Sequence, residues 1–249
     1  MRILYTILCV LFFGYCQGQA TCVGGGNNWS TGSFTSFTVV STFTATPTFV
    51  AVGVAWAPTS GTDYPTITDN YGNSYTLATR NIFSGWQGQY MAYTYGSLTA
   101  TTSLTVTVTY TGAAARGASV AVSGYSNVRT SSNPLDKTSG YNSNASSVST
   151  MNPGSITPTS VPNLIIFGGT YSTNAINTSV SGYNLRQYVN HSGNYTYALF
   201  DKTQTGSVGA ENPTLLISTG SNGAACGIFN VFCNAISTRC TTCDYFIDD

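Results

Sequence analysis

Short stretches in which apolar and polar residues alternate run through the middle of the chain. In residues 104–110 (LTVTVTY) the leucine, the two valines and the tyrosine fall on one side and the threonines on the other. Because successive side chains of a strand point to opposite faces, this pattern predicts a strand with one buried face and one face in solvent. Residues 48–57 predict a second such strand, in which three valines and Trp56 share the buried face.

Residues 164–169 (LIIFGG) are apolar on both sides, as expected of a central strand. Further candidate strands are equally short and lie between turns rich in Gly, Asn, Ser and Pro: residues 34–43, 66–68, 74–82, 89–97, 118–126, 195–202, 214–219 and 226–233. No stretch shows a competing helical period. The pattern predicts an all-β fold, a single antiparallel two-sheet sandwich of jelly-roll-like type with about 10–12 strands, over residues 34–234.

The segments between and beyond these strands are polar. Residues 69–73 (DNYGN) predict a turn that closes a hairpin, because Asn and Gly readily adopt positive φ. A calcium loop is the alternative, but the segment lacks the alternating Asp/Asn ligands and the terminal Glu of such loops. Residues 126–162 predict a long loop or a pair of irregular connections, residues 21–33 a Gly/Asn-rich lead-in to the sandwich, and residues 235–249 a cysteine-containing tail.

The first 20 residues predict a secretory signal peptide. Arg2 precedes an apolar run over residues 3–13, and Gly18 and Ala20 are the small residues before a cut after Ala20. The run is shorter than the roughly twenty residues that a membrane-spanning helix needs. A lipoprotein acylated at Cys16 is a weaker alternative, because a bulky residue precedes that cysteine. We therefore expect a secreted protein of the extracellular surface without a membrane span.

Cysteine usage agrees with export. Removal of the signal peptide leaves an odd number of cysteines: Cys22, Cys226, Cys233, Cys240 and Cys243. If residues 226–233 form one strand, Cys226 and Cys233 lie too far apart to bridge each other. A disulfide between Cys22 and one of the C-terminal cysteines fits the closeness of domain termini, with the pairing otherwise open. The leftover cysteine either links two molecules or stays buried.

Only 6% of the residues are charged, and the formal net charge is zero. The chain therefore lacks the basic surface that binding to nucleic acid requires. The single histidine, His191, lies in a polar loop segment, and the carboxylates considered for acid–base chemistry are expected in turns or at strand ends. Those carboxylates are Asp63, Asp69, Asp136, Asp201 and Glu211. We expect no catalytic residue, no metal site and no cofactor, with a glycoside-active enzyme as a distant alternative.

Several asparagines stand in Asn-x-Ser/Thr sequons, about as many as chance would place in a chain so rich in Ser and Thr. They are Asn28, Asn144, Asn177, Asn190 and Asn194. Their expected positions in loops permit glycosylation, and glycans would hydrate a surface that carries few charges.

The order of several motifs resembles a known family. The motifs are VAW at 54–56, DNYGNSY at 69–75, TVTVT at 105–109, YSNV at 125–128, NPLD at 133–136 and NLII at 163–166. This succession resembles a jelly-roll-like β-sandwich domain of unknown activity that is found in secreted and surface proteins of bacteria and in viral sequences. Over residues 34–233 the resemblance implies an extracellular sandwich with a non-catalytic surface role. Gly124 stands where that family usually has a glutamate, so no role of that carboxylate is expected here.

Surface contact is the kind of function that remains. We expect a non-enzymatic, secreted structural or adhesive protein of an extracellular surface or fibre, which associates with itself or with other surface proteins. Few charges are available to keep exposed strand edges apart, and this favours self-assembly. The alternative is a carbohydrate-binding, lectin-like module in which Trp86, Tyr90 and Tyr93 stack on the sugar rings of a glycan.

Overall fold

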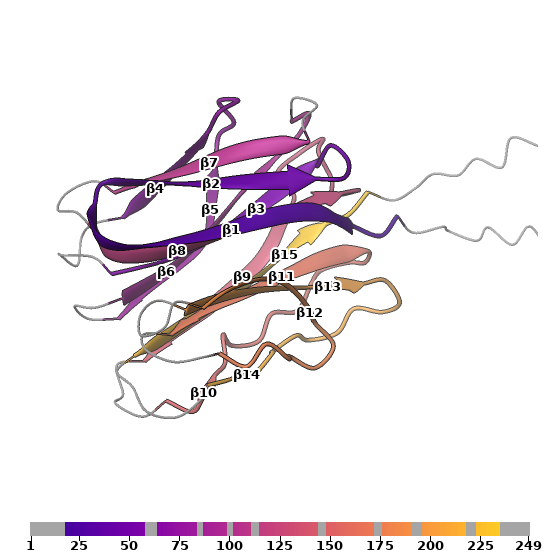
Figure 1. Ribbon diagram of the computed structural model, residues 1–249. Coiled ribbons are helices and arrows are strands. Elements are labelled where there is room, and N and C mark those ends of the chain that lie inside the picture. Colours follow the sequence, from indigo (N-terminus) through magenta and orange to yellow (C-terminus); the bar gives the residue numbers. More distant parts are fainter. Residues whose placement is uncertain are drawn as a thin grey trace, which may run out of the picture.

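The structure is a computed structural model that describes residues 18–57, 64–83, 87–98, 102–110, 115–143, 148–171, 176–190, 196–217 and 223–234. These ranges contain strands and no helix, which confirms the all-β prediction (Figure 1). The strands are β1 (Thr21–Phe34), β2 (Ser36–Phe43), β3 (Phe49–Trp56), β4 (Pro65–Asp69), β5 (Thr76–Phe83), β6 (Gln87–Tyr95), β7 (Ser103–Tyr110), β8 (Ala115–Ser126), β9 (Leu135–Ser143), β10 (Thr150–Met151), β11 (Asn163–Tyr171), β12 (Asn184–Val189), β13 (Thr196–Gln204), β14 (Leu215–Leu216) and β15 (Ala224–Phe232).

Eight strands form one antiparallel sheet in the order β4-β7-β2-β1-β8-β3-β6-β5. The sheet curls, so that β4, β7 and β2 lie above β8 and β6 in Figure 1. The space inside the curl is filled by a core to which both halves contribute, including Val39 and Val106 from the upper half and Val54, Trp56 and Val120 from the lower half.

A second antiparallel sheet, in the order β12-β13-β11-β15-β9, packs under the lower half of the curled sheet. The layer between them contains large buried side chains such as Phe49, Met91, Tyr125 and Phe229. The opposite face of the second sheet is covered by the short β10–β14 pair and by connecting segments. The two-sheet sandwich is therefore confirmed, with the first sheet folded back on itself.

The alternation read from the sequence is confirmed where it was clearest. In β7 the four apolar side chains are buried and the hydroxyl side chains between them are partly or fully exposed. Every residue of β11 is buried, as the predicted central strand requires. The structure has fifteen strands in its described residues, more than the expected count, because β1, β9, β10 and β12 carry no clear apolar alternation.

The expected lead-in, residues 21–33, instead belongs to β1. This strand pairs with β2 and β8 and lies between them in the sheet. A Cβ on Gly25 would lie 2.1 Å from the carbonyl oxygen of Val122, and one on Gly26 would lie 2.4 Å from that of Val40. The lead-in prediction was wrong because it took the glycines as evidence against a strand, in which glycine is rare. In β1 the missing side chains of Gly25 and Gly26 allow the neighbouring backbones to approach closely.

The expected long loop over residues 126–162 was also wrong in part. Its middle forms β9, which pairs with β15, and residues 150–151 form β10. The segment is rich in Ser and Asn, but residues 137–143 pair with β15, an apolar strand whose side chains are almost all buried. Tertiary pairing thus overrides a weak local preference.

Residues 69–73 form the predicted turn, but the turn does not close a hairpin. Asp69 accepts hydrogen bonds from the backbone N–H groups of Tyr71 (2.9 Å) and Asn73 (3.1 Å), and Gly72 has φ of 75°. The strands on either side, β4 and β5, lie at opposite edges of the curled sheet and pair with β7 and β6. The turn therefore crosses from one edge of the sheet to the other.

The two ends of the described chain lie side by side (Figure 1). Asn127 donates a side-chain hydrogen bond to the carbonyl of Gln19 (3.1 Å), and its own carbonyl accepts one from the N–H of Asn234 (2.8 Å). Of the expected signal peptide only residues 18–20 are described, and the expected tail, residues 235–249, lies outside the described residues. No helix with the length and apolar character of a membrane span occurs among the residues described.

Candidate functional site

The upper, outer side of the curled sheet carries rows of hydroxyl side chains. We call this surface the hydroxyl face and define it by Ser36, Thr38, Val40 and Thr42 of β2, Ser103, Thr105, Thr107 and Thr109 of β7, Thr66 and Thr68 of β4, and Asn27 and Trp29 of β1. The register aligns these residues across the strands: Thr68 lies opposite Thr107, and Thr107 lies opposite Thr38. Side chains directly opposite in a sheet are close neighbours, so the rows are continuous.

The same alternation builds both sides of this half of the sheet. Residues between the hydroxyl side chains, such as Ile67, Val106 and Val39, point inward and are buried in the core of the curl. The β-branched threonines on the other side favour the extended backbone and restrict their own χ1 angles. The hydroxyl face is therefore held by a packed core directly beneath it.

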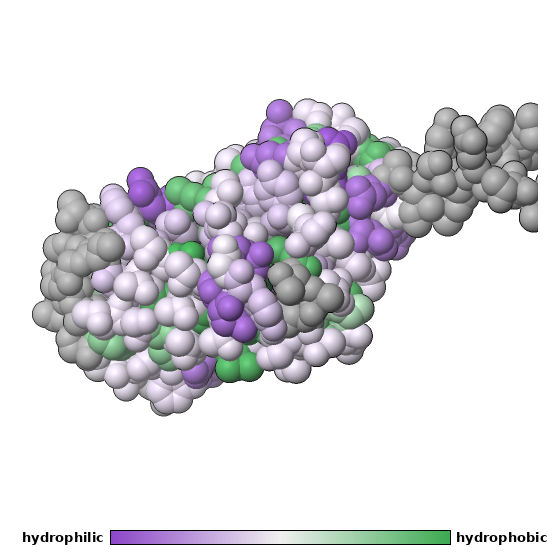
Figure 2. All heavy atoms as spheres, turned by 90° about the horizontal axis from the view of Figure 1, so that it is seen from above, coloured by the Kyte–Doolittle hydropathy of each residue, from purple (hydrophilic) through white to green (hydrophobic). Residues whose placement is uncertain are grey.

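The hydroxyl face contains no ionisable side chain. Its two large apolar side chains are well exposed, Trp29 at 46% and Val40 at 64%. Seen from above, the molecule is mostly pale, with strongly hydrophilic residues in small separate groups (Figure 2). A surface of this kind offers hydrogen bonds, methyl groups and one indole ring, but no ion pairs.

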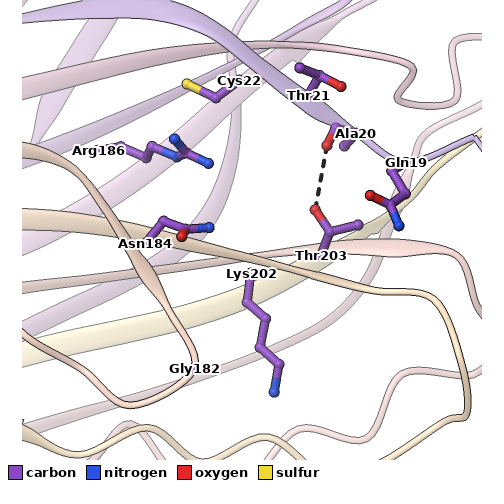
Figure 3. Close-up of a pocket in the computed structure, with 9 residues that line it drawn as sticks. All are labelled: Gln19, Ala20, Thr21, Cys22, Gly182, Asn184, Arg186, Lys202 and Thr203. Carbon is purple, nitrogen blue, oxygen red and sulfur yellow. Dashed lines mark hydrogen bonds between the residues drawn. The ribbon is translucent and has the colours of Figure 1, made fainter.

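A second candidate is a shallow depression of about 490 Å³ where β1 meets β12 and β13 (Figure 3). Cys22 and Thr21 lie on its upper side, and Asn184, Arg186 and Lys202 come from the second sheet below. The depression is thus lined by one thiol and by two cationic side chains, of which Lys202 points away from Cys22 (Figure 3).

Both cations of the depression are already paired with carboxylates. Arg186 Nε lies 2.5 Å from Asp201 Oδ2, and Lys202 Nζ lies 2.6 Å from Glu211 Oε1. Asn184 also donates to Asp201, at 3.0 Å. A bound anion would have to compete with these carboxylates for Arg186 and Lys202. The two ion pairs hold β12 against β13 and the segment around Glu211 against the sheet.

Buried tyrosines border these ion pairs. Burial raises the pKa of Tyr125 well above its ordinary value, and the nearby Asp201 carboxylate raises it further. Burial likewise raises the pKa of Tyr183, whose hydroxyl donates to Glu211 Oε2 at 3.0 Å. With their pKa values raised, both phenols keep their protons at neutral pH.

The other two described carboxylates also stabilise local structure. Asp69 accepts four hydrogen bonds in its turn, two of them from the Asn73 side chain (2.8 Å) and the Tyr75 hydroxyl (3.0 Å). Asp136 accepts from the backbone and hydroxyl of Thr159 at 2.7 and 3.0 Å. Asp63, a further candidate, and His191 lie outside the described residues.

The two tyrosines expected to stack on sugars pack against different core layers. Tyr93 is fully buried, stacks on Phe49 with ring centroids 5.6 Å apart and donates to Asn133 Oδ1 at 2.7 Å. The prediction for Tyr93 was therefore wrong, because its side of β6 faces the second sheet rather than solvent. Tyr90 is partly buried and packs edge-on against Trp56. Trp86 lies outside the described residues.

Three of the five predicted disulfide cysteines are described, and all three are free thiols: Cys22, Cys226 and Cys233. Cys226 and Cys233 are buried, and they face different core layers, which agrees with the expectation that they do not bridge each other. Cys22 is partly exposed and borders the depression. Cys240 and Cys243 lie outside the described residues.

Three of the sequon asparagines are described, and all three are exposed: Asn28, Asn177 and Asn190. Asn28 lies on β1 rather than in a loop, and its side chain donates to the carbonyl of Thr38 at 3.1 Å. Asn177 Oδ1 accepts from the N–H of Ser179 at 2.9 Å. Asn144 and Asn194 lie outside the described residues.

Neither the exposed position of Trp29 nor the alignment of the threonines follows from the local sequence pattern. The outward threonines of β7 could be read from its own alternation, but their rows depend on pairing with β4 and β2, which are distant in sequence. Comparison of the chain with protein-family models, with curated proteins and with solved structures found no match.

Proposed function

We propose that the protein is a non-enzymatic, secreted structural or adhesive β-sandwich that works at an extracellular surface through its hydroxyl face. The observation that supports this proposal is the set of aligned, uncharged and solvent-facing side chains on β4, β7, β2 and β1. Such a face adheres to hydrated, neutral material through many weak contacts, and its strength grows with the number of rows engaged.

The strand edges favour adhesion through the face over edge-to-edge assembly. The edge strand β4 is short and begins with Pro65, which cannot donate a ladder hydrogen bond. The edge strand β12 has an irregular register between Leu185 and Gln187, and the edges β5 and β9 are joined by a hydrogen bond from Thr138 Oγ1 to the carbonyl of Ala78 (3.0 Å). These features oppose pairing with a second chain.

The fixed carboxylates support a non-enzymatic role. Asp69, Asp136, Asp201 and Glu211 each accept two or more hydrogen bonds or ion pairs from groups that hold the fold. A general acid or base must instead reach a proton of the substrate. We assign these side chains to stability.

The proposal is tested by where the full chain goes when it is produced in its source cells. Thr107→Lys places a charge at the centre of the hydroxyl face, and Val208→Lys places the same charge at an exposed position outside it. We expect the unaltered chain and the Val208→Lys variant to be retained on the extracellular surface and Thr107→Lys to be released into the medium. Equal retention of both variants, or a chain that stays inside the cell, would contradict the proposal.

A further inference from the structure

Trp29 lies on the hydroxyl face where β1 adjoins β2. The pairing of Gly25 with Thr42 sets the register, and continuing it places Asn27 beside Val40 and Trp29 beside Thr38. The hydrogen bond from Asn28 Nδ2 to the carbonyl of Thr38 (3.1 Å) agrees with this register. On the other side of β1, Trp29 pairs with Ser119 of β8, on the outer side of the curl.

The neighbouring positions on the hydroxyl face carry neutral hydrogen-bonding side chains. Asn27 Nδ2 donates to Gln187 Oε1 of β12 at 2.7 Å, which links β1 to the second sheet beside the face. Thr38 and Thr107 continue outward from Trp29 in one row. An exposed aromatic ring, adjoining amide groups and hydroxyl groups form one neutral surface that extends across several strands.

This combination matches a neutral polysaccharide better than a protein partner. Sugar rings present C–H faces that pack on an indole and hydroxyl groups that both donate and accept hydrogen bonds. A stable protein interface needs an apolar centre, whereas this face has only Trp29 and Val40 as large exposed apolar side chains. An anionic chain would find no cation on the face to pair with.

The twist of the sheet narrows the ligand further. Neighbouring strands in a sheet are rotated by about 20–25° relative to each other, so rows on four strands do not lie in one plane. A rigid crystalline surface would touch few of them, while a flexible chain can follow the twist. We propose that the hydroxyl face is a binding site for a flexible, neutral polysaccharide chain, with a sugar ring stacked on Trp29; this inference rests on the proposed function and names its ligand.

Affinity electrophoresis tests the inference directly. The protein is run through gels that contain hydroxyethyl cellulose, laminarin or galactomannan as neutral probes, or alginate as an anionic probe. We expect at least one neutral polysaccharide, but not alginate, to retard the protein. We expect Trp29→Ala to weaken that binding about tenfold, which corresponds to about 1.4 kcal/mol, and Trp29→Phe to keep part of it.

Two controls make the result specific. Tyr141→Ala removes an aromatic ring of similar exposure from β9, outside the face, and should leave retardation unchanged. The protein is made without N-glycosylation, because a glycan on Asn28 would lie next to Trp29. The inference would be overturned if none of the neutral probes retards the protein, or if alginate retards it equally or more strongly. It would also be overturned if the Trp29→Ala variant binds as well as the unaltered chain.

The outcome is separable from that of the proposed function. If no polysaccharide binds but Thr107→Lys still releases the chain from its surface, the ligand assignment alone is wrong. Sedimentation of the purified chain then shows whether the face binds a second copy of the chain. If Thr107→Lys is retained as well as the unaltered chain, the proposed function itself is wrong.

Discussion

Asp69 shows how much one side chain contributes to this fold. Its carboxylate accepts hydrogen bonds from Tyr71, twice from Asn73 and from Tyr75, and so fixes the crossing between the two edges of the curled sheet. Hydrogen bonds to a charged group contribute about 1.5–3 kcal/mol each at most, and unpaired buried donors add a cost. The turn was predicted from Asn and Gly, and the four hydrogen bonds that the Asp69 carboxylate accepts explain why it forms.

We expect Asp69→Ala to lower the free energy of unfolding by about 2–3 kcal/mol, because it leaves the Tyr75 hydroxyl and two backbone N–H groups without their acceptor. Urea denaturation measures the change. Thr68→Ala, on the exposed side of β4, is the control and should change the free energy by less than about 0.5 kcal/mol. An Asp69→Ala protein as stable as the control would show that the hydrogen bonds to Asp69 do not stabilise the fold.

At the residue scale the sequence predicted burial better than site residues. Alternation in residues 104–110 was enough to separate inward from outward side chains, because the two-residue period is a property of a single strand. Tyr93 and Trp29 could not be assigned in this way. Which side of β6 meets the second sheet, and whether a Gly/Asn-rich segment becomes a strand, depends on contacts with β3, β8 and β15 that lie far away in sequence.

The strand β1, which local patterns did not predict, is closely packed between its neighbours. It lies between β2 and β8 in the curled sheet, and Gly24, Gly25 and Gly26 admit no side chain without a shift of the adjoining backbone. Glycine was read as a sign of a lead-in to the sandwich, while the role of Gly25 and Gly26 is close packing. The same long-range dependence accounts for β9, whose polar residues pair with β15.

We expect Gly25→Ala to destabilise the fold by about 1–3 kcal/mol, the usual cost of forcing an atom into a packed site. The added Cβ would meet the Val122 carbonyl oxygen at 2.1 Å and the Gln187 side chain at 2.7 Å. Gly206→Ala is the matched control, since a Cβ there has no atom within 4 Å. Thermal and urea unfolding of the two variants should differ; equal stability would mean that β1 is not packed as described.

At the scale of the whole molecule, burial of thiols and phenols links stability to pH. Burial raises the pKa of Cys226 from an ordinary value of 9.0 to about 12 and that of Cys233 to about 11. Above pH 9 the unfolded chain loses these protons while the folded chain keeps them, so the unfolded state binds fewer protons and stability falls as pH rises. Buried tyrosines with raised pKa values, such as Tyr110 and Tyr125, act in the same direction.

We expect the free energy of unfolding, measured in urea with reductant present, to fall by about 1–3 kcal/mol between pH 9 and pH 10. In a Cys226→Ala variant this fall should be smaller, because one of the buried thiols is removed. Alkylation of the folded protein at pH 8 should label Cys22, which is partly exposed, much faster than Cys226 and Cys233. Stability that stays constant across this range, or equal labelling of the three thiols, would contradict the described burial.

The most direct measurement is oxidative footprinting of the protein while it is bound to its extracellular surface. Trp29, on the hydroxyl face, and Tyr141, on β9 outside the face, are 46% and 42% exposed, so Tyr141 serves as an internal control for Trp29 in the same molecule. We expect binding to slow the oxidation of Trp29 relative to the free protein and to leave that of Tyr141 unchanged. Oxidation of Trp29 at the same rate in the bound and free protein would contradict adhesion through the hydroxyl face.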